Sequence, residues 1–207
     1  MRFLLLCSLF FSTVAMAETN RTDKLADAIE QNNFKKAKSA VLAGADVNGR
    51  DHYNTPASSL FLRAVKLNRV KIVELLLKHN ADVNQTRGID LYSGLLISAK
   101  YGHSAMAKIL IENDADVNHK TNAFRTALHV AALHNSISVV EELIKVDHID
   151  ANISNIGGLC ALAVAARQNR EEIAQLLKDR SNQKCIARAI ELAEYNDHGN
   201  IINILKK

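Results

Sequence analysis

Apolar residues recur at helical spacing in three segments of the chain, residues 73–77, 107–111 and 140–144. Charged residues interrupt each run of aliphatic side chains, as in Val73-Glu74-Leu75-Leu76-Leu77. Such spacing predicts amphipathic α-helices that bury one face. A shorter helix is predicted upstream of each, at residues 93–99, 126–132 and 160–166, where Ala and Leu dominate. The pattern therefore predicts pairs of helices along the chain.

A four-residue turn recurs after the predicted long helices. Ala-Asp-Val-Asn stands at residues 45–48, 81–84 and 115–118, and Ile-Asp-Ala-Asn stands at 149–152, so that the Asn residues are 36, 34 and 34 residues apart. A near-constant period of this length indicates a repeat protein whose units bury their apolar faces only by stacking. We expect the Asp of each copy to organise its turn and the Asn to bond turn backbone.

The repeated motifs resemble the ankyrin repeat. The segment from Thr126 to Ala132, the turn Tyr101-Gly102-His103, the aliphatic triplets and the Ala-Asp-Val-Asn turns match its consensus from residue 25 to 207. The resemblance implies an all-α solenoid of helix-turn-helix units joined by hairpin-like loops. We place the units at about residues 22–49, 50–85, 86–119, 120–153 and 154–180, with a C-terminal capping unit at 185–207.

Two departures from the consensus stand out. An insertion of about three residues follows Pro56, the only proline, and predicts a lengthened turn there. Only His129 keeps the histidine of the motif, so other groups must supply its hydrogen bonds in the remaining units.

The N-terminus has the pattern of a cleavable secretory signal peptide over residues 1–17. Arg2 is followed by an apolar run to Val14 and by Ala15-Met16-Ala17. The run is too short to span a bilayer as a helix. We therefore expect export, to the periplasm or out of the cell, with no stable membrane insertion after cleavage.

The resemblance implies that partners are proteins and that they bind the concave face, built from hairpin tips and inner helices. The tips expected to contribute include Ile89 through Tyr92, Asn122, Ile156 and Leu159. The residues selected as partner-binding are His52, Tyr53, Lys66, Tyr92, Lys100, Tyr101, Phe124, Arg125, Leu133, His134 and Arg167. Exposed aromatic residues beside Arg are typical of binding hot spots.

The composition and motifs give little support for other functions. Without residues 1–17 the chain has 25 basic and 22 acidic residues, a balance too mild to indicate nucleic acid binding. The motifs for nucleophilic catalysis, metal ligation and phosphate binding are missing, so we expect no enzyme activity, no cofactor and no metal.

Cys160 and Cys185 remain after the signal peptide, and in an exported protein a disulfide between them is chemically permitted, if their backbones come close enough. The alternative interpretation is two small buried residues.

The sequence thus predicts a monomeric, non-catalytic exported adaptor or stabiliser that holds another protein. A secreted effector that binds a host protein is the alternative, and a thiol-redox enzyme using Cys160 and Cys185 is the weaker one. The identity of the partner is not encoded in these patterns.

Overall fold

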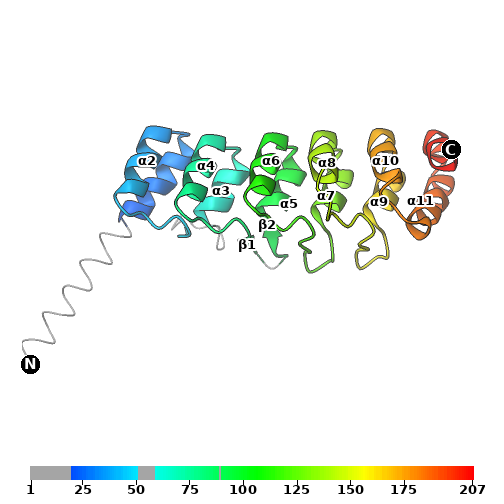
Figure 1. Cartoon of the computed structure of the whole chain (residues 1–207), viewed down its shortest axis with the longest axis horizontal. Helices are drawn as coiled ribbons and strands as arrows, with labels where there is room; N and C mark the ends of the chain where they lie inside the picture. Colours follow the sequence, from blue (N-terminus) through cyan, green and yellow to red (C-terminus); the bar gives the residue numbers. More distant parts are fainter. Residues whose placement is uncertain (1–19, 51–58, 89) are drawn as a thin grey trace, which may run out of the picture. The chain divides into compact units, whose positions relative to one another are not determined.

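The computed structural model describes residues 20–50, 59–88 and 90–207, which form two compact units, Met1–Gly88 and Ile89–Lys207. His52 and Tyr53 lie outside the described residues, as does the insertion after Pro56. Figure 1 shows the helices, which occur in successive pairs within each unit. We call the first helix of each pair the inner helix and the second the outer helix.

The N-terminal unit contains two helix pairs. Residues 20–30 form its first helix. The elements that follow are α2 (Phe34–Leu42), α3 (Leu60–Lys66), α4 (Val70–Lys78) and the short strand β1 (Thr86–Arg87).

The C-terminal unit begins with the short strand β2 (Tyr92–Ser93) and continues with four helix pairs. These are α5 (Gly94–Tyr101) with α6 (Ser104–Glu112), α7 (Ala127–His134) with α8 (Ile137–Ile144), α9 (Ala161–Arg167) with α10 (Glu171–Lys178), and α11 (Gln183–Tyr195) with α12 (Gly199–Lys206). Inner helix α7 packs between α5 and α9, and α9 also packs on α11, whereas outer helix α8 packs on α6 and α10. The unit is therefore a stack of helix pairs, with the loops before α7 and α9 extending to the same side (Figure 1).

Small residues allow the inner helices to pack closely. The first six residues of α9, from Ala161 to Ala166, are all buried, and residues 94–99 and 127–132 of α5 and α7 are buried as well. Leu95, Leu128 and Leu162 supply much of the apolar volume between neighbouring pairs. Only the C-terminal ends of these three helices reach the surface.

Local signals set the ends of the inner helices. The Ser93 side chain accepts a hydrogen bond from the Leu96 amide at 3.5 Å, and Ser59 accepts one from Leu62 at 3.1 Å. The inner helices α5, α7 and α9 each end near a residue with a left-handed backbone, which is Gly102, Asn135 and Asn169 respectively. Gly and Asn adopt this conformation at low cost and therefore commonly end helices.

The repeated turns confirm the expected roles of Asp and Asn and extend them. In all four copies the Asp carboxylate accepts a hydrogen bond at 2.9 Å from the amide of the Asn two residues later, as Asp116 does from Asn118. The Asn side chain then bonds the next turn, because Asn118 accepts from the Asp150 amide at 2.9 Å and donates to the His148 carbonyl at 2.9 Å. Each Asp thus holds its own turn, and Asn48 in the N-terminal unit and Asn118 in the C-terminal unit join their turns to the next copy.

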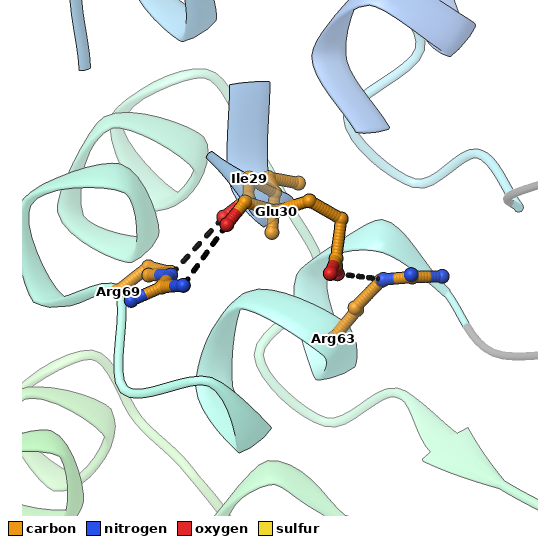
Figure 2. Close-up of polar contacts among 4 residues, drawn as sticks. All are labelled: Ile29, Glu30, Arg63 and Arg69. Atoms are coloured by element: carbon orange, nitrogen blue, oxygen red, sulfur yellow. Dashed lines mark hydrogen bonds and ion pairs between the residues drawn. The ribbon is translucent and has the colours of Figure 1, made fainter. Parts of the chain in front are cut away.

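The N-cap residue of an outer helix forms a second link to the preceding pair. In the N-terminal unit Arg69 donates from Nε to the Ile29 carbonyl at 3.1 Å and from a terminal nitrogen to the Glu30 carbonyl at 3.0 Å, as Figure 2 shows. Arg63 pairs with the Glu30 carboxylate beside it (Figure 2). In the C-terminal unit His198 donates from Nδ1 to the Ala166 carbonyl at 2.8 Å. Arg69 and His198 therefore satisfy helix-end carbonyls of the previous repeat, whereas the buried Nε of Arg170, at the same position before α10, has no hydrogen-bond partner among the residues that the structure describes.

Candidate partner-binding surface

Large apolar residues occupy the hairpin tips of the C-terminal unit in a conformation that favours glycine. Leu91 and Phe124 both have φ of 55°, and the equivalent residue of the next hairpin is Gly158, with φ of 71°. The left-handed region is costly for a side chain with a Cβ atom. Phe124 is 51% exposed and Leu91 is 39% exposed, so neither side chain offsets this cost by full burial.

The tips are ordered by short-range hydrogen bonds. The Thr121 amide donates to the Arg125 carbonyl at 3.0 Å, and the Thr121 hydroxyl accepts from the Arg125 amide at 3.1 Å. The next hairpin is joined to this one through the Ile156 amide, which donates to the Ala123 carbonyl at 3.1 Å. Ile156 itself is 75% exposed, so Leu91, Phe124 and Ile156 present apolar side chains on successive tips. We call these three residues the tip surface.

His129 fixes the base of two hairpins. Its Nδ1 accepts from the Thr126 amide at 3.2 Å and lies 2.9 Å from the Thr126 hydroxyl, and its Nε2 donates to the Leu159 carbonyl at 2.9 Å. Burial lowers the pKa of His129. The hydrogen bond to the Leu159 carbonyl raises this pKa, whereas the positive charge of Arg125 lowers it further, and the net shift is downward. The imidazole is therefore neutral at pH 7 and joins α7 to the following hairpin.

A second group of predicted residues meets at the C-terminal ends of α5 and α7. The Lys100 ammonium lies 5.8 Å from the centre of the Tyr101 ring, which stacks on His103 with centroids 5.8 Å apart. Lys100, Tyr101 and His134 line one pocket of about 360 Å³, together with Gly102 and Ser136. Partial burial and the nearby Lys100 charge lower the pKa of His134.

The other residues that were predicted to bind a partner differ in their exposure. Arg125 and Arg167 are exposed, whereas Tyr92 and Leu133 are half-buried. Lys66 is exposed at the end of α3 in the N-terminal unit. Leu159, expected at a tip, is only 6% exposed and serves as the acceptor for His129, so its expected contact role was wrong.

Sequence reasoning missed the pocket at Ser136. The sequence does contain a signal for this pocket, which appears when the repeats are aligned. The N-cap residue of the outer helix is Arg69 before α4, His103 before α6, Arg170 before α10 and His198 before α12. The N-cap of α8 is Ser136, whose side chain is shorter than these four; the first outer helix, α2, has Asn33. The small size of Ser136 leaves space where these four repeats have a long side chain.

The two cysteines lie next to each other in the C-terminal unit. Both are free and buried, with Cys160 at the start of α9 and Cys185 in α11. Burial raises the pKa of Cys185 to about 12, with further contributions from its hydrogen bond to Cys160 and from nearby negative charge. A thiol in this state is a poor nucleophile, because the thiolate is the reactive form.

The described residues contain neither a cluster of three or more His, Cys, Asp or Glu side chains suited to a metal ion nor a helix long and apolar enough to cross a membrane.

Comparison with known proteins agrees with the repeat architecture. A profile of ankyrin repeats in three copies matches residues 25–121 and 95–189. A protein from Medicago truncatula named VAPYRIN-LIKE is 23% identical over 143 residues, which cover 67% of this chain and 29% of that protein. A protein of Acanthamoeba polyphaga mimivirus named for its ankyrin repeats is 27% identical over 158 residues, covering 73% of this chain and 20% of its own length. The alpha-latroinsectotoxin of Latrodectus tredecimguttatus is 31% identical over 126 residues, 59% of this chain and 8% of the toxin. The chain thus spans less than a third of the length of these relatives.

Proposed function

Because this chain belongs to the ankyrin repeat family, whose repeats generally mediate protein–protein interaction, we propose that it captures another protein through its C-terminal unit. The contact residues are the tip surface and the exposed ends of α5, α7 and α9. The observation that carries this proposal is the exposure of Leu91 and Phe124 at backbone positions that favour glycine. Strained, exposed apolar residues are retained where a function depends on them.

Charge on the same surface supports a protein partner. Four cationic residues, Lys100, Lys120, Arg125 and Arg167, stand in the hairpins and inner helices of residues 90–101, 119–134 and 153–168, against Asp90 alone as an acidic residue. None of the four forms an ion pair with any residue that the structure describes. Arg and aromatic residues are enriched at protein interfaces, and the rim of an interface is polar.

The destination of the chain is part of the proposal. The apolar run before Ala15-Met16-Ala17 supports export, so the partner is either another exported protein or, for a secreted effector, a protein of a host. A thiol-redox role is disfavoured by the buried Cys185 thiol, whose pKa is raised to about 12.

The test is capture by the immobilised chain from the medium and periplasm of the producing cell. The double variant Tyr101→Ala and Phe124→Gly removes one exposed aromatic from each end of the surface. Tyr195→Ala is the matched control, since Tyr195 is 86% exposed at the end of α11, outside the proposed surface. We expect one stoichiometric partner to be retained by the parent chain and by the control, and about tenfold less by the double variant.

Equal capture by all three chains would contradict the proposed surface. Loss of capture by Tyr195→Ala alone would move the surface to the C-terminal cap. If the producing cell yields no partner, the same three chains are applied to host extract, and retention there with the same pattern assigns the effector role. N-terminal sequencing of the exported chain is expected to begin at Glu18.

A further inference from the structure

The pocket between the helix pairs α5–α6 and α7–α8 exists because Ser136 is short. At the equivalent positions Arg69 and His198 extend back to helix-end carbonyls of the preceding pair, and their side chains fill this space. Ser136 cannot reach as far. The result is an open pocket of about 360 Å³ lined by Lys100, Tyr101, Gly102, His134, Ser136 and Ile137, among others.

Ser136 is a largely buried residue whose hydroxyl group opens into the pocket without a partner in the described part of the chain. The residue is 8% exposed, and its side chain forms no hydrogen bond with any described residue. The hydroxyl faces the end of α5, because a Cβ atom built on Gly102 would lie 3.7 Å from Ser136 Oγ. The oxygen of this hydroxyl is not fully enclosed, so a ligand or water in the pocket can reach it.

The pocket is bordered by the C-terminal ends of α5 and α7, which carry partial negative charge, and by three features that favour an anion. The N-terminus of α8, an eight-residue helix, borders the pocket, and its first amides lack partners within the helix. Lys100 adds a full positive charge, and none of the lining residues is acidic. The Tyr101 ring, 46% exposed, provides an apolar wall for the stem of a bound side chain.

We propose that this pocket binds the carboxylate of an acidic side chain of the partner protein, held by Lys100, the Ser136 hydroxyl and the first amides of α8. The inference rests on the proposed function and specifies the chemistry of the partner. One lysine and a helix N-terminus match the single charge of a carboxylate, and because the same pair of groups also binds phosphate, the experiment compares the two anions. A guanidinium in the pocket would repeat the arrangement of Arg69, but Lys100 would repel it.

The experiment uses small probes that carry only the side chain of interest. N-acetylglutamate α-amide is titrated into the ¹⁵N-labelled full chain, up to about 100 mM at constant ionic strength, since single contacts of this kind are weak and are screened by salt. N-acetylglutamine amide is the neutral isostere. N-acetylarginine amide and inorganic phosphate test the other occupants. The readout is the chemical shift of the Gly102, Ser136 and Ile137 amides.

We expect saturable shifts of these three amides with the glutamate probe and none with the glutamine probe. Lys100→Gln should weaken binding about tenfold, because a charge-assisted contact is lost. Ser136→Arg should abolish binding by filling the pocket, and it should fold normally because Arg69 and Arg170 occupy the equivalent position. Lys184→Gln, which removes an exposed cation of α11 outside the pocket and outside the proposed surface, should leave binding unchanged.

Equal shifts with the glutamate and glutamine probes, or shifts that persist in Ser136→Arg, would overturn the carboxylate site. Saturable binding of the arginine probe, or phosphate binding about tenfold tighter than the glutamate probe, would assign the pocket to that chemistry instead. Failure of the titration while partner capture still depends on Phe124 would remove this site and leave the proposed function standing. Failure of both would remove the surface as a whole.

Discussion

Phe124 combines a backbone strain with an exposed side chain, and the two contributions can be separated by mutation. Its φ of 55° lies in the left-handed region, which costs a residue with a Cβ atom about 1–2 kcal/mol. Phe124→Ala removes the ring but keeps the Cβ atom and therefore keeps the strain. Phe124→Gly removes both, at the cost of a more flexible unfolded chain.

We expect Phe124→Gly to have a free energy of unfolding about 1 kcal/mol higher than Phe124→Ala, measured by urea denaturation. The matched substitution Gly158→Ala should lower the free energy of unfolding by a similar amount, because Gly158 occupies the same turn position with φ of 71° and has open space around it. If Phe124→Gly were less stable than Phe124→Ala, the backbone conformation of Phe124 would be unstrained. The exposure of the ring at this position would then no longer point to a function.

At the scale of elements, the links between helix pairs depend on single polar side chains. His129 is the clearest case, because its neutral imidazole accepts at Nδ1 from Thr126 and donates at Nε2 to Leu159. Its pKa is lowered below 6.5 in the folded chain, mainly by burial, so the unfolded chain binds the proton more readily. The stabilisation is therefore complete above pH 6.5 and decreases as the pH falls below that value.

We expect His129→Ala to lose about 2 kcal/mol of unfolding free energy at pH 7.5, because the buried Leu159 carbonyl and the Thr126 amide lose their partner. The difference between this variant and the parent chain should shrink between pH 6.5 and pH 5, measured by urea denaturation at each pH. His134→Ala is the control, since His134 is exposed and should change stability little. A constant difference across the pH range would show that His129 does not titrate between the folded and unfolded states.

The elements that carry the repeat could be predicted from the sequence because their signals are local and periodic. The Asp of each turn and the aliphatic faces of helices such as α4 and α8 follow from residue type and spacing. The long-range role of Asn118 could not be predicted from its own segment, because the Asp150 amide it bonds belongs to the next turn. The pocket at Ser136 and the strain at Phe124 depend on comparing equivalent positions in three dimensions, where one short or one bulky residue breaks the pattern.

At the scale of the whole molecule, each helix pair of the stack is held in place by the pairs next to it. The pair α11 and α12 packs on α9 and α10, and Cys185 of α11 lies against Cys160. Helix pairs can open locally without global unfolding of the stack. The reactivity of the two buried thiols therefore reports how firmly α11 is closed against α9.

Alkylation of the two cysteines measures this closure and tests whether a disulfide forms. The pKa of Cys185 is raised to about 12, first by burial and then by its hydrogen bond to Cys160, so its thiolate is scarce at pH 8. Iodoacetamide should therefore label Cys185 about a thousandfold more slowly in the native chain than in urea, followed by mass spectrometry of its peptide. Cys160→Ser is the control, and it should leave Cys185 slow because burial is the main cause. Native rates close to those in urea would show that α11 is open in solution. Absence of labelling in urea until reductant is added would show that Cys160 and Cys185 had formed the disulfide that an oxidising compartment permits, in place of the free thiols of this structure.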